Sequence, residues 1–277
     1  MSLLIIFICL LLCYYYSSII ENFEQMSIID DQIVPWYYIN MDKSVSRGEK
    51  LLNEFRKYNL KHVFRIKAVE PPDLSHWNIQ ISSNCSKKNS LVEIACSISH
   101  LKAIFTAYKN NDRFAVICED DIFFLRQPNI AKIIKTAQQQ IPDFSIIQLY
   151  SIGPIAEKIY QFEKIPFIPY VHGLWSTAAY LISRKGMENI LDTFIGNEYK
   201  QIEKFSSVSS FNLNPPIHCA ADYLIYSLDG TFTFTDFILA TLPIPSTIQE
   251  SSHEVIQNRT RKLIFEIIKT KGFKNNW

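Results

Sequence analysis

Residues 113–124 read Arg-Phe-Ala-Val-Ile-Cys-Glu-Asp-Asp-Ile-Phe-Phe. The apolar run from Phe114 to Cys118 is too short for an ordinary helix and is rich in strand formers, so it predicts a strand buried on both faces. Three carboxylates, Glu119, Asp120 and Asp121, follow where that strand leaves its sheet. Because adjacent carboxylates repel and a buried carboxylate is costly without a partner, we expect a positive group beside them.

A divalent cation is the most economical positive group for this position. Oxygen ligands on a short acidic turn suit Mg²⁺ or Mn²⁺, which also bind substrate phosphates. The alternatives are a solvated acidic loop and a helix N-terminus, where Asp and Glu are favoured. The stretch by itself does not separate these interpretations.

The composition excludes several classes of protein. A chain of 277 residues, 48% of them apolar, can bury the core of one large domain. Its 28 basic and 27 acidic residues nearly cancel, which argues against a nucleic-acid-binding protein. Only seven glycines are present, with no GxGxxG or Walker-type loop, so a nucleotide would have to be held in another way.

The N-terminus predicts a membrane anchor. Residues 2–20 carry no charge and just reach the length that spans a bilayer, and the tyrosines at 14–16 suit its interface. A cleaved signal peptide is the competing interpretation, but a basic n-region and a small-x-small cleavage site are both missing. We therefore expect a single-pass anchor over residues 1–20, a polar stem over 21–32 and a lumenal folded domain, although no basic residue before Lys43 fixes the orientation.

Strand and helix patterns alternate along residues 33–250. This order predicts one α/β domain with a mostly parallel sheet flanked by helices, in which ligands bind beyond the carboxyl ends of the strands. The acidic triplet stands at such an end. The polar residues 73–89 and the serine-rich residues 197–216 are predicted to be loops, the second a mobile lid. Residues 251–277 predict a basic amphipathic helix that lies on a membrane surface or packs on the domain.

The cysteines allow one disulfide and indicate no zinc site. Cys85 and Cys96 could pair across a short loop if the domain is lumenal. Neither a CxxC pair nor a Cys/His spacing typical of zinc sites is present.

Four segments, taken in order, resemble glycosyltransferase family 25. The matching segments are Tyr-Ile-Asn-Met-Asp at 38–42 with Arg47, Glu-Ile-Ala-Cys-Ser-Ile-Ser-His at 93–100, Ala-Val-Ile-Cys-Glu-Asp-Asp at 115–121 and Ala-Ala-Tyr-Leu-Ile-Ser-Arg-Lys-Gly at 178–186. Ala221-Asp222 resembles a later and weaker motif. Ala95 stands where the family usually has glycine, a departure that concerns helix packing more than chemistry.

This resemblance implies a GT-A fold, which is related to the Rossmann fold, and a hexosyltransferase. Such an enzyme would use Mn²⁺ or Mg²⁺ to move galactose or glucose from a UDP-sugar to a hydroxyl of a glycan or protein. The resemblance places the metal at Glu119 and Asp121. It places the nucleotide-sugar near a set of polar residues, namely Asn40, Asp42, Arg47, His100 and Asp120.

Two further residues are weaker candidates. Asp222 is expected to contact the acceptor or act as a base if the enzyme inverts, or else to cap its own helix. His253 is expected to complete the metal shell, or else to be a surface histidine. Two other functions stay open, a membrane-anchored carbohydrate-binding protein without turnover and a metal-dependent phosphohydrolase.

Overall fold

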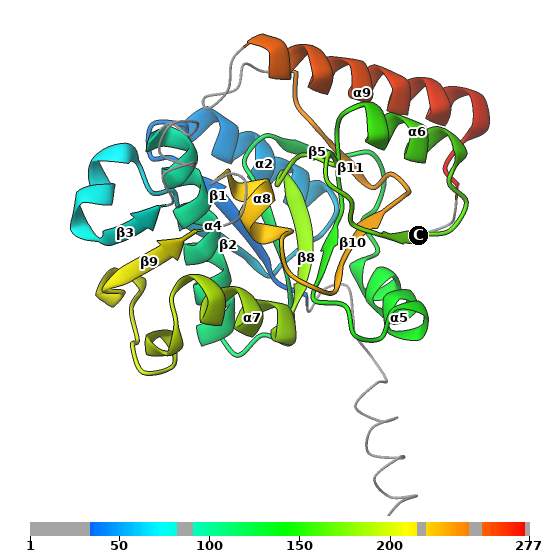
Figure 1. Cartoon of the computed structure of the whole chain (residues 1–277). Coiled ribbons are helices and arrows are strands. Elements are labelled where there is room, and N and C mark those ends of the chain that lie inside the picture. The colour runs from blue at the N-terminus through cyan, green and yellow to red at the C-terminus, as the bar shows by residue number, and fades with distance from the viewer. Residues whose placement is uncertain (1–33, 82–90, 215–219, 244–250, 275–277) are drawn as a thin grey trace, which may run out of the picture.

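The computed structural model describes residues 34–81, 91–214, 220–243 and 251–274, without the side chains of 251–253. The predicted anchor and stem lie outside the described residues. A central sheet has helices packed on both of its faces (Figure 1). Its strands stand in the order β2-β1-β4-β8-β6-β10-β7, and in chain order they are β1 (Trp36–Asn40), β2 (Val63–Lys67), β4 (Phe114–Glu119), β6 (Ile146–Gln148), β7 (Phe167–Pro169), β8 (Ala179–Ser183) and β10 (Thr231–Phe234).

The expectation of a mostly parallel sheet was wrong, because the sheet is mixed. Strand β1 is parallel to β2 and β4, and β6 is parallel to β10. Strand β8, however, runs antiparallel between β4 and β6, and β7 runs antiparallel to β10. A strand buried on both faces has the same apolar run in either direction, so the sequence pattern carries no information about direction.

Alternating side chains of the central strands build two cores, one on each face of the sheet. In β1, Tyr37 and Ile39 enter one core, whereas Trp36 and Tyr38 enter the other. The first core is covered by α4 (Leu91–Lys109), α7 (Arg184–Phe194) and α8 (Ala221–Ile225). The second is covered by α2 (Val45–Lys57), α5 (Ile130–Gln140), α6 (Pro154–Phe162) and α9 (Ser251–Lys271).

Helix α4 is a core helix. Eleven of its nineteen residues are buried, including Ser97, Ser99 and His100. It is also the one helix among the described residues that is long and apolar enough to cross a membrane, and 61% of that stretch is buried inside the fold. Its apolar length therefore reflects burial in the core, where it contacts β1, β2, β4, α7 and α8.

A separate two-stranded sheet forms within the two segments, 73–89 and 197–216, that were predicted to be loops. Strand β3 (Asn78–Ile81) pairs in parallel with β9 (Ser210–Leu213), and short 3-10 helices at 71–76, 197–200 and 205–207 flank them. The buried side chains of Tyr199, Phe205 and Phe211 join the first core. Serine-rich composition concealed these aromatic anchors, so residues 197–213 form packed structure instead of a free lid.

Helix α9 packs on the domain, which was the second interpretation of its basic amphipathic pattern. Its Ile264 and Ile267 belong to the second core. Arg259 Nε lies 2.7 Å from the Glu157 carboxylate of α6. The last small sheet joins β5 (Ile122–Phe124) to β11 (Leu239–Thr241) beside the acidic turn.

Candidate active site

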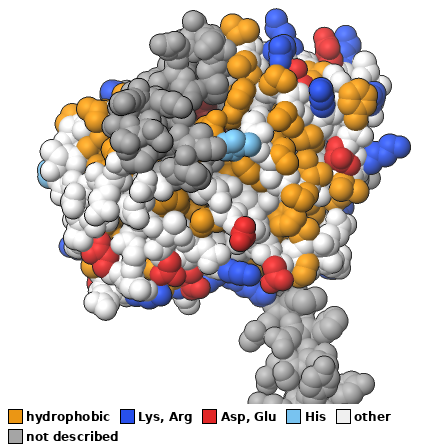
Figure 2. Space-filling model, viewed as in Figure 1, with side chains coloured by type: hydrophobic (Ala, Val, Ile, Leu, Met, Phe, Trp, Pro, Cys, Tyr) orange, Lys and Arg blue, Asp and Glu red, His pale blue; other side chains and the backbone are white. Residues whose placement is uncertain are grey.

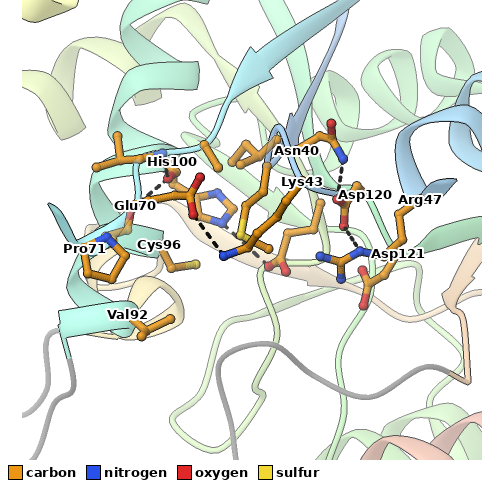
Figure 3. Close-up of a pocket in the computed structure, with 17 residues that line it drawn as sticks. Asn40, Lys43, Arg47, Glu70, Pro71, Val92, Cys96, His100, Asp120 and Asp121 are labelled. Carbon is orange, nitrogen blue, oxygen red and sulfur yellow. Dashed lines mark hydrogen bonds and ion pairs between the residues drawn. The ribbon is translucent and has the colours of Figure 1, made fainter. Parts of the chain in front are cut away.

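A cavity of about 400 Å³ opens where β1 and β4 end side by side. Because the two strands are parallel and Ile39 pairs with Glu119, the next residues of both strands emerge at the same edge of the sheet. Figure 3 shows the polar side chains that gather there from β1, α2, α4 and the acidic turn. Those that carry the argument are Asn40, Arg47, Cys96, His100, Glu119, Asp120 and Asp121.

Asp120 is buried and held by two neighbours. Asn40 Nδ2 donates to one carboxylate oxygen over 2.7 Å, and Arg47 Nε lies 3.4 Å from the other. Burial raises the pKa of Asp120, while the bond from Asn40 and the charge of Arg47 oppose that rise. Gly48 of α2 permits this arrangement, because a Cβ atom there would stand 3.2 Å from Asn40 Oδ1.

Asp121 is the least compensated of the three carboxylates. The residue is partly exposed, but its Oδ1 is sealed from solvent and has no hydrogen-bond partner among the described residues. Burial, reinforced by the charges of Glu119 and Asp120, raises the pKa of Asp121 to about 8. An unpartnered oxygen in this setting is costly unless a proton or a cation balances it.

Glu119 is connected to His100 of α4. Thr177 Oγ1 donates to Glu119 Oε1 over 2.8 Å, and His100 Nε2 lies 3.7 Å from the same oxygen. The His100 ring is fully buried, and its Nδ1 stands 3.2 Å from the Tyr180 hydroxyl. His100 therefore lies behind the acidic turn and contacts it from the core.

Comparison with known proteins identifies the family. The family model of glycosyltransferase family 25, described as LPS biosynthesis protein, matches residues 33–201. The chain belongs to glycosyltransferase family 25. It is also 25% identical over 242 residues to a provisionally named glycosyltransferase of Haemophilus influenzae, covering 85% of this chain and 82% of that protein. The acidic turn and its cavity are thus features of a glycosyltransferase.

A solved structure shares a weaker likeness. The apo form of WbbM, a bifunctional glycosyltransferase, superposes with a TM-score of 0.39 and 9% identity. The likeness covers 85% of this family-25 chain but only 45% of the WbbM chain.

The oxygen-rich part of the site fits a hard divalent cation. Asp121 Oδ1 is buried without a hydrogen-bond partner in the described chain. The cavity lining carries four carboxylates against the charges of Arg47 and Lys43, and Lys43 pairs with Glu70 at 3.0 Å. Carboxylate oxygens at this density are the ligands that Mg²⁺ and Mn²⁺ take in proteins.

Three of the predicted residues stand apart from this cluster. Asp42 is exposed, lies outside the cavity lining and pairs with Arg65 at 2.7 Å and Lys67 at 2.8 Å. Asp222 occupies the first turn of α8, where its Oδ1 accepts the backbone N–H of Tyr223. The side chain of His253 lies outside the described residues.

Asp222 is nonetheless close enough to act electrostatically on the cavity. Burial raises the pKa of the Cys96 thiol, and the charges of Glu119 and Asp222 raise it further. Asp222 does not line the cavity that holds the acidic turn. The structure thus separates the acidic turn from this second, more distant carboxylate.

Sequence reasoning missed several residues that organise the site. Arg65 of β2 donates to Asn40 Oδ1 over 2.9 Å, and Thr177 bonds Glu119. Thr177 immediately precedes the segment 178–186 that carries the family resemblance, so its position offered a signal. Arg65 offered none, because its role depends on the pairing of β1 with β2, in which it stands opposite Tyr38.

Proposed function

We propose that this family-25 enzyme transfers a hexose, galactose or glucose, from a UDP-sugar to a hydroxyl group of a glycan or protein. The transfer would depend on Mn²⁺ or Mg²⁺ held by Glu119 and Asp121. A chain anchored by residues 1–20 would carry out this reaction at a membrane, with the folded domain in the lumen.

The observation that carries the proposal is the charge imbalance at the acidic turn. Asp121 has a sealed oxygen without a hydrogen-bond partner in the described chain, and burial together with the neighbouring carboxylates raises its pKa to about 8. A bound cation would balance this charge and would also stabilise the diphosphate as it leaves the sugar. A purely carbohydrate-binding protein would gain nothing from such a costly cluster.

The surrounding residues would position the donor. Asn40 and Arg47 fix the Asp120 carboxylate, so that this group keeps one orientation toward the nucleotide. Arg65 in turn holds Asn40 through its Oδ1. Thr177 holds Glu119 through a hydrogen bond to its Oε1. A rigid cluster of this kind lowers the cost of organising the donor for transfer.

Asp222 would serve the acceptor. Its place outside the acidic turn suits a carboxylate that contacts the incoming hydroxyl, or that accepts its proton if the reaction inverts the sugar. His253 would add a ligand to the cation from α9. Both roles remain predictions from the family resemblance.

The test is calorimetric titration of the full-length protein with a panel of nucleotide-sugars, in Mn²⁺ and again in chelator. We expect one UDP-sugar to bind only with the metal. Asp121→Asn should weaken that binding by roughly 10²–10³-fold, by analogy with the loss of one strong electrostatic contact in other enzymes. Asparagine keeps the shape of the protonated carboxyl, so the variant should fold.

Asp143→Asn is the matched control, because the Asp143 side chain is 92% exposed and lies outside the cavity lining. It should bind the donor as the wild type does. Unchanged metal-dependent binding in folded Asp121→Asn would remove the metal assignment. Absence of binding across the whole panel would favour a protein that has kept the fold and lost turnover.

A further inference from the structure

Beside the oxygen-rich cluster, three side chains of different chemistry converge on one point. Cys96 and His100 come from α4, and Glu119 comes from the end of β4. Cys96 Sγ, a ring nitrogen of His100 and a carboxylate oxygen of Glu119 all lie within 4.8 Å of one another. We propose that they form a second metal site, for a thiolate-binding cation such as Zn²⁺, which shares Glu119 with the oxygen-rich site.

His100 is the strongest argument for a ligand at this point. Its ring is fully buried, and Nε2 has no hydrogen-bond partner in the described part of the chain. Its other nitrogen, Nδ1, stands 3.2 Å from the Tyr180 hydroxyl. With the ring N–H on Nδ1 donated to Tyr180, the lone pair of Nε2 faces Cys96 and Glu119. Metal-binding histidines are typically held by such an outer hydrogen bond.

Cys96 supplies the ligand that gives this site its selectivity. It stands four residues before His100, so both side chains project from the same face of α4. Cys96 is partly exposed and lines the cavity, and Figure 3 shows its sulfur and the His100 ring on the same side of it. On binding, the thiol releases its proton to solvent and a metal–sulfur bond forms. A Cys, His and carboxylate set selects Zn²⁺ over Mg²⁺ or Mn²⁺.

The spacing of the ligands is compatible with a tetrahedral ion. Metal–ligand bonds of about 2.0–2.3 Å place the ligand atoms of a tetrahedral zinc site roughly 3.3–3.8 Å apart. The widest observed separation, up to 4.8 Å, therefore needs to close by about 1.0–1.5 Å. Because all three residues line the cavity, a water molecule from it would supply the fourth ligand. The site thus resembles open zinc sites with three protein ligands more than closed structural ones.

The shared Glu119 couples the two sites. A zinc ion at Cys96 and His100 would draw the Glu119 carboxylate away from a cation at Asp121. Zn²⁺ should therefore oppose Mn²⁺-dependent donor binding. This consequence rests on the proposed function, whereas the zinc site itself does not.

Cobalt provides a direct probe, because Co²⁺ bound to a thiolate absorbs in the near ultraviolet by charge transfer. The full-length protein, kept reduced with a phosphine, is titrated with Co²⁺ and then with Zn²⁺. We expect a charge-transfer band that saturates at one equivalent and disappears when Zn²⁺ is added. Cys96→Ser should lose the band, and His100→Gln should weaken Co²⁺ binding by at least tenfold.

Cys118→Ala is the matched control. Cys118 lies on β4 one residue before Glu119, but its side chain is fully buried in the core on the opposite face of the sheet. This variant should keep the band. A band that persists in Cys96→Ser, or a folded wild type that shows none, would overturn the zinc site. Both results depend only on the absorbance of bound Co²⁺, so they are independent of the calorimetric test of donor binding.

Discussion

Two acidic positions in this fold, Asp236 in the core and the turn at Glu119, Asp120 and Asp121, are compensated to different degrees. Asp236 is 1% exposed, yet Arg126 NH2 stands 3.1 Å from one of its oxygens and the backbone N–H of Phe237 donates to the other. At the acidic turn, Glu119, Asp120 and Asp121 face one arginine, and Asp121 Oδ1 has no hydrogen-bond partner in the described chain. The chain neutralises a structural carboxylate itself but leaves the cavity short of positive charge. An imbalance of this kind is typical of a functional site.

The charges on the surface differ from those in the cavity. Basic and acidic side chains are interspersed on the face shown in Figure 2, so charges there are balanced by neighbours and by water. The concentrated charge lies inside, at the edge of the sheet. This distribution agrees with the near-zero net charge and with a ligand held in a cavity.

The largest expected effect is a loss of stability when the buried ion pair of Asp236 and Arg126 is broken. Asp236→Asn leaves the guanidinium of Arg126 buried without its counter-charge, and we expect a loss of about 3–5 kcal/mol of unfolding free energy. Urea denaturation followed by circular dichroism measures it. Donor binding by the fraction that remains folded should be unchanged, because neither residue lines the cavity. A loss below about 1 kcal/mol, the value of an exposed pair, would show that the two carboxylates are not treated differently.

The sequence predicted the acidic turn but not the buried ion pair of Asp236. The apolar run before Glu119 predicted a buried strand, and the structure places that strand, β4, in the interior of the sheet between β1 and β8. The acidic triplet therefore could be placed at a strand end without coordinates. Asp236 carried no signal, because its partner Arg126 is distant in sequence and the two meet only through tertiary packing.

The same limit explains the errors. The direction of β8 and the pairing of β3 with β9 depend on which elements meet in space, and local periodicity does not encode that. Likewise, the sequence indicated no zinc site, because Glu119, which lies beside Cys96 and His100, comes from another element. Family resemblance brought Asn40, Arg47 and Asp120 to one site, although it did not reveal that Arg65 holds the Asn40 side chain.

The next effect is a pH dependence of stability that arises from Asp121 in the acidic turn. The pKa of Asp121 rises from 3.8 in the unfolded chain to about 8 in the folded one. A raised carboxyl pKa means that the folded state binds the proton more tightly. The stability that this proton contributes is therefore complete below pH 4 and is lost as the pH rises toward 8. Metal-free wild type should lose stability across this window, and Asp121→Asn should lose less.

Thermal unfolding of both proteins in chelator, at half-unit steps from pH 4.5 to 8.5, tests this expectation. The melting temperature of Asp121→Asn should exceed that of the wild type by a margin that grows with pH. Addition of Mn²⁺ at pH 8 should raise the melting temperature of the wild type but not that of Asp121→Asn, because the cation replaces the proton that Asp121 has lost. Parallel pH curves for the two proteins would mean that Asp121 is ionised in the folded chain at all these values.

The smallest effect is the most local. Gly48→Ala adds a Cβ atom 3.2 Å from Asn40 Oδ1, a contact tight enough to push the amide by a few tenths of an ångström. Asn40 cannot move freely, because Asp120 and Arg65 hold both ends of its amide. Helix propensity favours alanine over glycine by up to about 1 kcal/mol, so global stability should change little. Donor affinity, however, should fall several-fold as Asp120 is displaced. Titration calorimetry measures the donor affinity, and a melting curve measures the global stability. If Gly48→Ala matches the wild type in both, the position of Asn40 does not matter to the site.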